Sequence, residues 1–367
     1  MTSSLQTPTL AGHATAKATD RYRARFAGRF AEGFYRKSLD RLSASSIGAG
    51  TYLGESDDDD DARYFETISG AIASGINLID TAINYRCQRS ELTIGRALNS
   101  VVRDGVASRE ELVICTKGGY IPLDRSAPPS RAAYQSYVQS EFYDQGIMEP
   151  ADVVAGAHCM APKYLTHQLS KSRANLGLRT IDLYYLHNPE QQLDVLDRQA
   201  FLDRIRSAFT CLEERVSQGE IGRYGCATWN GFRVAPEAPG HLSLEELVQV
   251  ATEVGGKDHH FRVIQLPINL GMVEAVRHPT QRLGNQTATL LDVAHHFGIA
   301  VVASASLLQS RLASGLPQGV RDAFPTLTSD AQRALAFTRS LPAVSAALVG
   351  MKSIAHLQEN LGSARAG

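Results

Sequence analysis

The chain has 367 residues, of which 43% are hydrophobic and 20% are charged, and its 37 basic and 38 acidic residues leave a formal net charge of −1. This composition excludes a disordered chain, and no apolar run approaches the roughly 20 residues that a membrane-spanning helix needs. The near-neutral charge lacks the basic excess that is typical of nucleic-acid recognition. We therefore expect a soluble protein that binds neither nucleic acid nor membrane. Its length allows two or three small domains or one large α/β barrel.

The five cysteines are widely spaced and odd in number, and they include no Cys-x-x-Cys pair of the kind found in zinc sites and redox motifs. We interpret them as reduced thiols. The segment Met1–Lys17 is rich in Ser, Thr and Ala and lacks the apolar core of a secretory signal. We therefore expect a cytoplasmic protein, and a transit peptide remains an open alternative.

Residues 1–34 form a predicted N-terminal extension with an amphipathic stripe. Aromatic side chains recur in it at four-residue spacing, with arginines between them: Tyr22, Phe26, Phe30 and Phe34. This spacing predicts a helical packing face. We expect the stripe to dock against the rest of the chain or a second subunit, with a membrane surface or a partner helix as the alternative.

From about residue 44, short β-branched or apolar runs alternate with longer segments of helical period. The predicted strands are 46–52, 77–82, 112–117, 181–186, 224–228, 263–266, 300–303 and 345–349. The predicted helices are 62–74, 90–102, 163–175, 198–218, 244–254, 288–297, 329–339 and 354–364. Eight strands, each followed by a helix, predict a (β/α)8 TIM barrel, which we assign to residues 35–367.

Local signals support these helix boundaries. Four glycines are predicted as left-handed C-caps: Gly75, Gly177, Gly255 and Gly298. The acidic run 57–61 precedes the first barrel helix. We interpret it as a solvated N-terminus that complements the helix dipole, rather than as a metal cage.

One long gap, between the third and fourth strands, contains a proline-rich insertion at 120–161. Loops at the C-terminal ends of the strands form the active-site face of such barrels. We therefore expect the insertion to be a lid that sets substrate preference, through one or more of its aromatic side chains: Tyr134, Tyr137, Phe142 and Tyr143.

Four polar residues stand at or just beyond predicted strand ends: Asp80, Tyr85, Lys117 and His187. Taken singly, each has a structural explanation as a surface ion-pair member or a buried histidine. Together they predict a proton relay. A carboxylate would keep a buried lysine charged, the lysine would make the phenol a better proton donor, and a neutral imidazole would orient a carbonyl oxygen.

The segments 80–85, 113–117, 182–187, 264–269 and 349–361 resemble, in that order, motifs of the aldo-keto reductases. The resemblance covers about residues 35–364. It implies a (β/α)8 barrel that transfers a hydride between a nicotinamide dinucleotide and an aldehyde or ketone. It further implies that Tyr85 is the general acid, that Lys117 and Asp80 tune it, and that His187 orients the substrate.

The resemblance also implies a cofactor site. Gln265 stands where the family binds the nicotinamide carboxamide, and Thr228 replaces the usual Ser-Asn pair. Ser304 stands where an aromatic ring usually stacks on the nicotinamide. Further residues are assigned to the same site: Thr51 and Leu307, with Glu359 and Asn360 at the adenine end.

The loop after the eighth strand predicts the choice of cofactor. Lys352 offers a cation to a 2′-phosphate, Ser353 adds a hydroxyl, and His356 stands where the family often has an arginine. We therefore expect NADP (NADPH) to be preferred modestly, with NAD as the less favoured cofactor. A Rossmann domain is not supported, because no Gly-x-Gly-x-x-Gly fingerprint is present, and no metal site is expected.

The leading hypothesis is an NADP(H)-dependent carbonyl reductase or alcohol dehydrogenase acting on a small-molecule carbonyl or alcohol. The alternative is a nicotinamide-bound regulatory or binding subunit with little turnover, similar to the β-subunits of potassium channels. The missing stacking aromatic and the N-terminal extension favour this alternative slightly. Assembly into a homo-oligomer is left open.

Overall fold

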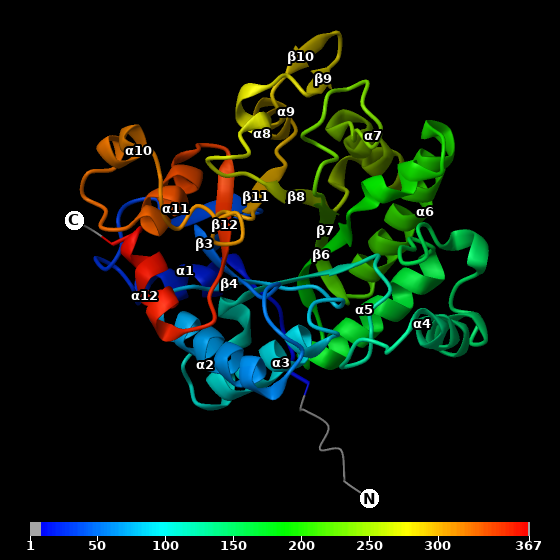
Figure 1. Ribbon diagram of the computed structural model, residues 1–367, viewed down its shortest axis with the longest axis horizontal. Helices are drawn as coiled ribbons and strands as arrows, with labels where there is room; N and C mark the ends of the chain where they lie inside the picture. Colours follow the sequence, from blue (N-terminus) through cyan, green and yellow to red (C-terminus); the bar gives the residue numbers. More distant parts are fainter. Residues whose placement is uncertain (1–8, 366–367) are drawn as a thin grey trace, which may run out of the picture.

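A closed barrel of eight parallel strands forms the centre of the computed structural model, which describes residues 9–365 (Figure 1). Around the barrel the strands follow the order β11-β12-β3-β4-β5-β6-β7-β8. Their bounds are β3 (Ile47–Gly50), β4 (Leu78–Asp80), β5 (Val113–Gly118), β6 (Ile181–His187), β7 (Ile221–Ala227), β8 (Phe261–Pro267), β11 (Ala300–Ser304) and β12 (Val344–Gly350). Each overlaps one predicted strand, so the predicted barrel is confirmed. The first eight residues of the segment Met1–Lys17, for which a transit peptide was left open, lie outside the described residues.

Helices surround the barrel in the expected order. Those overlapping the predicted segments are α2 (Asp58–Ser74), α3 (Arg89–Arg103), α5 (Pro162–Leu176), α6 (Arg198–Ser217), α7 (Leu244–Gly255), α9 (Leu290–His296), α11 (Asp330–Ser340) and α12 (Ile354–Gly362). Gly75 and Gly177 are left-handed C-caps, with φ of 112° and 61°. The prediction for Gly255 is wrong by one residue, because it ends α7 and the cap is Gly256. Gly298, with φ of 65°, follows Phe297, the C-cap of α9.

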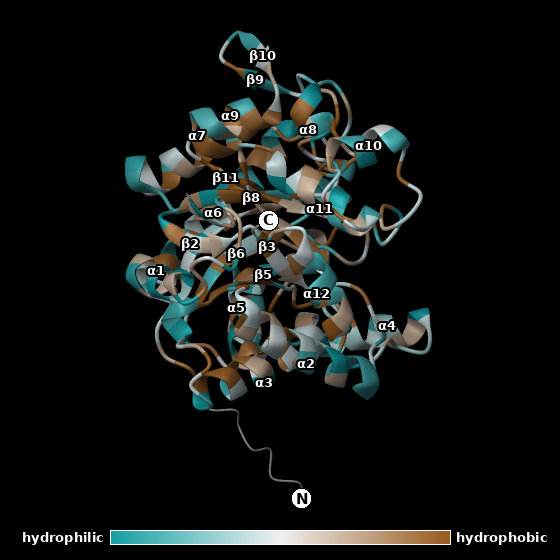
Figure 2. Ribbon diagram, turned by 90° about the vertical axis from the view of Figure 1, so that its left-hand side faces the viewer, coloured by the Kyte–Doolittle hydropathy of each residue, from teal (hydrophilic) through white to brown (hydrophobic). Residues whose placement is uncertain are grey.

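The core has two layers, one inside the barrel and one between the strands and the helices. Figure 2 shows brown, hydrophobic residues concentrated in barrel strands such as β5 and β8, and teal residues on the outer turns of the helices. The strands are buried on both faces. Their sequences are therefore continuous apolar runs, without the alternation of apolar and polar residues that a half-exposed strand has. At Gly225 a Cβ atom would lie 1.8 Å from the carbonyl oxygen of Val263, so this strand contact requires glycine.

The N-terminal end of the barrel is covered by a hairpin and a helix. The hairpin pairs β1 (Tyr35–Leu39) with β2 (Leu42–Ser45), and α1 (Ala16–Ala24) precedes it. Tyr22 is fully buried, and its hydroxyl donates to the carbonyl of Ile76 over 3.2 Å. The aromatic stripe therefore packs against its own barrel. The expected single helix is too long, because α1 ends at Ala24. Phe26 lies in the turns beyond it, and Phe30 forms an isolated bridge with Arg365 and stacks on Phe34 at 3.9 Å.

Apart from Tyr120, which lies at the barrel mouth, the insertion 120–161 packs beside α5. It contains α4 (Arg131–Val138) and a π-helical turn, Gln139–Tyr143. Its aromatic side chains join a separate apolar cluster with Tyr164 of α5. Figure 1 shows α4 at the periphery beside α5. The predicted lid contacts of Tyr134, Tyr137, Phe142 and Tyr143 are therefore wrong, because these rings bury their surface against α5.

The other described elements are short and lie at the rim: α8 (Glu274–Arg277), α10 (Gln318–Ala323) and the hairpin of β9 (Gln281–Leu283) with β10 (Gln286–Ala288). Within residues 9–365, no helix combines the length and apolarity needed to cross a membrane.

Candidate active site

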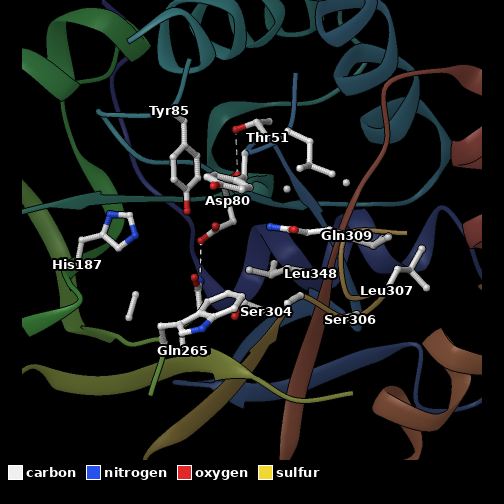
Figure 3. Close-up of a pocket in the computed structure, with 18 of the residues that line it drawn as sticks. Thr51, Asp80, Tyr85, His187, Gln265, Ser304, Ser306, Leu307, Gln309 and Leu348 are labelled. Carbon is white, nitrogen blue, oxygen red and sulfur yellow. Dashed lines mark hydrogen bonds between the residues drawn. The ribbon is translucent and has the colours of Figure 1, made fainter. Parts of the chain in front are cut away.

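A cavity of about 440 Å³ opens at the C-terminal ends of the barrel strands. Its walls come from strand ends and from the loops that follow them, as expected for the active-site face of this fold. Figure 3 shows Asp80, Tyr85, His187 and Gln265 turned toward the same space. The structure thus brings together residues from three segments that are far apart in the sequence.

Asp80 and Lys117 form an ion pair in the floor of the site. Their side chains are 5% and 1% exposed, and Nζ of Lys117 lies 2.5 Å from Oδ1 of Asp80. The ammonium group also donates to the carbonyl of Thr81 over 2.8 Å, and Nε2 of Gln265 donates to Oδ2 of Asp80 over 2.8 Å. Burial lowers the pKa of Lys117, but the carboxylate of Asp80 and the phenol of Tyr85 together outweigh this effect and raise that pKa above its ordinary value. Lys117 is therefore a cation at neutral pH.

Tyr85 lies directly in front of this pair. Nζ of Lys117 is 4.9 Å from the centre of the Tyr85 ring. Burial raises the pKa of the phenol, Lys117 lowers it and Asp80 raises it, so the net pKa lies above the ordinary value. The phenol is therefore protonated at neutral pH, with a cation beside it that stabilises the phenolate left after proton loss.

His187 completes the predicted set at the end of β6. Its ring lies edge-on to Tyr85, with the ring centres 5.8 Å apart. Burial and the nearby Lys117 hold the pKa of His187 well below its usual range, so the imidazole is neutral. Among residues 9–365, Nδ1 has no hydrogen-bond partner. The ring also lines the cavity, so it borders the space that a ligand would occupy.

A second buried histidine fixes the backbone of His187. Nε2 of His158 lies 2.7 Å from the carbonyl oxygen of His187, and Nδ1 lies 2.8 Å from Nε2 of Gln192. The amide nitrogen of Gln192 is a donor, so Nδ1 must accept and Nε2 must carry the proton that it donates to His187. Burial lowers the pKa of His158 to about 4, which agrees with a neutral ring.

The predicted cofactor residues fall into two groups. Thr51, Thr228, Gln265 and Leu307 line the cavity, as does Ser304. The second group lies outside the cavity lining, in the loop after β12 and in α12: Lys352, Ser353, His356, Glu359 and Asn360. Ser353 caps α12 and accepts a hydrogen bond from the backbone N–H of His356 over 3.2 Å.

Lys352 is paired with a carboxylate from the acidic run. Its Nζ lies 3.2 Å from Oδ2 of Asp60, whose side chain is only 4% exposed. Asp61 in turn lies 2.6 Å from Arg86. The expectation of a fully solvated run is therefore wrong for Asp60 and Asp61, although Asp57 does cap α2 by accepting from the N–H of Asp60. Lys352 and Arg86 lie on loops whose position beside α2 could not be predicted from the sequence.

Several buried polar atoms fit a bound dinucleotide. The hydroxyls of Thr228 and Ser306 line the cavity, and Asn360 lies in the last turn of α12; in the described part of the chain, these two hydroxyls and Nδ2 of Asn360 have no hydrogen-bond partner. Buried polar atoms are normally paired, so such vacant donors and acceptors indicate positions for a polar ligand. Among residues 9–365, no group of three or more His, Cys, Asp or Glu side chains is arranged to hold a metal ion.

Sequence reasoning missed part of the wall. Tyr52, Asn84, Tyr120 and Asn188 line the cavity without having been singled out, and Trp229 was noted only as a neighbour of Thr228. The available signal was position, because each follows a barrel strand by a few residues.

Comparison with known proteins identifies the family. The model of the Aldo/keto reductase family matches residues 46–323. A curated relative, the NADH-specific methylglyoxal reductase of Escherichia coli (strain K12), is 25% identical over 191 residues. That match covers 51% of this chain and 49% of the relative, so it spans about half of the relative's length.

Solved structures share the fold. An aldo/keto reductase from Klebsiella pneumoniae, in complex with NADP and acetate, superposes with a TM-score of 0.59 at 19% identity, covering 90% of this chain and 89% of that one. The holo form of an aldo-keto reductase from Bacillus halodurans gives a TM-score of 0.57 at 18% identity, covering 88% and 87%. Because the family model matches most of the chain, this protein belongs to the aldo/keto reductase family of oxidoreductases.

Proposed function

We propose that the protein reduces the carbonyl group of an aldehyde or ketone, or oxidises the corresponding alcohol, with NADP(H) as cofactor. The observation that carries this proposal is the buried Lys117–Asp80 pair behind the ring of Tyr85. At a site where a phenol must lose and regain a proton, a lysine cation held by a carboxylate stabilises the phenolate. When bound, the dinucleotide supplies or accepts the hydride.

The chain's own residues then have defined roles in the reduction. His187 donates a hydrogen bond from its neutral ring and orients the carbonyl oxygen. As the carbonyl carbon gains the hydride, Tyr85 gives its hydroxyl proton to that oxygen, and the product is the alcohol. The resulting phenolate is stabilised by the Lys117 cation, which Asp80 and the carbonyl of Thr81 hold in place. Oxidation of the alcohol reverses these steps.

The cofactor would extend from the cavity toward α12. Gln265, Thr228, Thr51 and Leu307 would contact its nicotinamide half, with Ser304 in place of a stacking ring. The adenosine half would meet a second set: Lys352, Ser353, His356, Glu359 and Asn360. The Klebsiella pneumoniae structure contains NADP, which supports NADP(H), whereas the Escherichia coli relative is NADH-specific. The pairing of Lys352 with Asp60 agrees with a preference for NADP(H) that is only modest.

The structure weakens one argument for the alternative role as a regulatory subunit. The aromatic stripe of the N-terminal extension is buried against the barrel, so it is not a free surface for a partner. The arrangement of Tyr85, Lys117, Asp80 and His187 favours catalysis.

The variant Tyr85→Phe tests the proposal. It keeps the ring and removes only the hydroxyl, so the reduction rate should fall by about 10²–10⁴-fold while cofactor binding persists. Tyr143→Phe, which removes a phenol in the insertion, is the matched control and should keep full activity. Near wild-type turnover by Tyr85→Phe would refute the mechanism. Tight dinucleotide binding by the wild type, without turnover of any carbonyl compound, would favour the regulatory role.

A further inference from the structure

Exposed aromatic side chains gather at the mouth of the cavity. Residues 9–365 expose five large hydrophobic side chains, and three of these line the cavity: Tyr52, Leu53 and Trp229. Tyr52 is 57% exposed and Trp229 is 42% exposed. Exposed apolar side chains that cluster around a polar site usually mark a surface that a ligand covers.

These rings lie beside the groups that would act on the carbonyl. The ring of Tyr52 packs edge-on to Tyr85, with the centres 5.1 Å apart. Tyr120 packs edge-on to His187 at 4.9 Å, and its hydroxyl accepts a hydrogen bond from Nδ2 of Asn188 over 2.9 Å. An aromatic wall therefore borders the proton donor and the imidazole. A group attached to a carbonyl carbon at this position would lie against that wall.

Within residues 9–365, the cavity lining offers no free cation to an anionic substrate. It contains no lysine or arginine, and Lys117, which lies behind it, is bonded to Asp80. His187 is neutral, because its pKa is well below the usual range. Outside the lining, Arg233 bonds the carbonyl of Trp229 and lies 3.0 Å from Glu274, while Lys352 is held by Asp60. A substrate carboxylate would thus lose its hydration without gaining an ion pair.

We infer that the substrate is an uncharged aldehyde or ketone whose carbonyl carries an aromatic ring or a similarly flat apolar group. Tyr52 and Trp229 hold that group at the cavity mouth, and the lack of a free cation among the described lining residues disfavours anionic analogues. This inference rests on the proposed function. In the reduction, the carbonyl carbon gains a hydride from the reduced dinucleotide and the oxygen gains the proton of Tyr85.

Two benzaldehydes of nearly equal size test the role of charge. 4-Formylbenzamide and 4-formylbenzoate share the ring and the aldehyde and differ by one negative charge. We expect kcat/KM for the amide to exceed that for the carboxylate by at least about tenfold, which corresponds to about 1.4 kcal/mol. The variant Tyr52→Lys places a cation at the mouth and should lower the amide-to-carboxylate ratio. Because the intrinsic reactivity of each aldehyde is the same with both enzymes, a change in the ratio reports on the cavity.

A second series tests the aromatic wall. Trp229→Ala should raise KM for 4-formylbenzamide by a factor several times larger than its effect on KM for propanal, and Trp229→Phe should restore most of the loss. Val195→Ala, which alters an exposed apolar side chain outside the cavity, is the control.

Binding can be measured without turnover, because Trp229 is the only tryptophan in the chain. With the oxidised dinucleotide present, 4-formylbenzamide should quench the fluorescence of Trp229 at a lower concentration than 4-formylbenzoate does. Equal kcat/KM for the two benzaldehydes, together with a ratio that Tyr52→Lys does not move, would overturn the inference and leave the proposed function intact. Failure to reduce any aldehyde, charged or neutral, would overturn the proposed function itself and this inference with it.

Discussion

Lys117 lies behind Tyr85 with its ammonium group 4.9 Å from the centre of the phenol ring. Burial raises the pKa of Tyr85, and Lys117 lowers it. Lys117→Met removes the lowering contribution, so the pKa of Tyr85 should rise further. Alcohol oxidation requires the phenolate, and we therefore expect its pH optimum to move to higher pH. Reduction at neutral pH should fall by about 10²–10⁴-fold.

The measurement is the pH profile of alcohol oxidation for the wild type and Lys117→Met. Thermal unfolding must accompany it, because the variant leaves Asp80 without its buried partner. A folded variant that is slower but has an unchanged optimum would show that Lys117 does not tune Tyr85.

Asp60 is paired with Lys352, the residue that we propose meets the 2′-phosphate of the cofactor. Hydrogen bonds from the N–H of Glu55 and from Lys352 keep the pKa of this buried carboxyl below its ordinary value despite its burial, so it is ionised at neutral pH. Asp60→Asn keeps the shape and removes the charge. We expect the Kd for NADPH to fall roughly three- to tenfold, because an anion that opposes the 2′-phosphate is lost. The Kd for NADH should change less than twofold.

Asp59→Asn is the matched control for this prediction, since Asp59 is exposed on the same helical turn and the substitution changes the net charge equally. Cofactor fluorescence titration gives both constants. An equal gain for NADPH and NADH, or an equal effect of Asp59→Asn, would contradict a specific role for Asp60.

At the scale of elements, the loop after β4 shows how Tyr85 is held. Arg86, Cys87 and Gln88 are three successive non-glycine residues with positive φ, between 48° and 69°. The buried side chain of Arg86 donates to the carbonyls of Glu55 and Asp57 and pairs with Asp61. These bonds to the loop after β3 and to α2 stabilise a backbone conformation that such residues rarely adopt by themselves.

The part of the insertion that packs against α5 should contribute to stability and not to substrate choice. Phe142 is 3% exposed in the cluster that joins the insertion to Tyr164 of α5. Phe142→Ala should lower the free energy of unfolding by about 3–5 kcal/mol, as large-to-small core substitutions do, and leave the ranking of carbonyl substrates unchanged. Urea denaturation and kcat/KM for a panel of aldehydes measure the two effects.

Tyr120 provides the contrast within the same insertion, because it lines the cavity. Tyr120→Ala should change the ranking of the same aldehydes. If Phe142→Ala changed that ranking as much as Tyr120→Ala, the cluster that packs on α5 would also be determining substrate choice, contrary to this prediction.

At the scale of the whole molecule, buried neutral histidines make stability depend on pH. Burial lowers the pKa of His158 to about 4, whereas an unfolded histidine titrates near pH 6.5. Between these values the unfolded chain binds the proton and the native protein does not. Stability therefore falls as the pH drops from about 6.5 to about 4, by up to about 3 kcal/mol for this residue.

His158→Gln removes the titration and keeps a side-chain N–H that can donate to the carbonyl of His187. We expect the variant to lose less stability than the wild type over this pH range, measured by urea denaturation at several pH values. Parallel stability curves for the two proteins would contradict the role assigned to His158.

The sequence by itself determined the barrel and most of the reactive residues. Strand and helix periods are local properties, and apolar strands buried on both faces left a clear pattern from β3 to β12. Asp80, Lys117 and His187 could be placed together because parallel strands converge at their C-terminal ends. The roles that we propose for these residues rest on this placement and on the family resemblance.

Only the tertiary structure decided what lies beside those elements. The insertion carries aromatic residues that are compatible with a lid, and the packing surface offered by α5 settled its position. Asp60 and Lys352 are 292 residues apart, and nothing in either local segment predicts their pairing. Nothing in the local segments predicts that the rings of Tyr52, Tyr120 and Trp229 line one cavity. Contacts of this kind depend on how loops fold over a closed barrel, and that geometry has no periodic signal in the sequence.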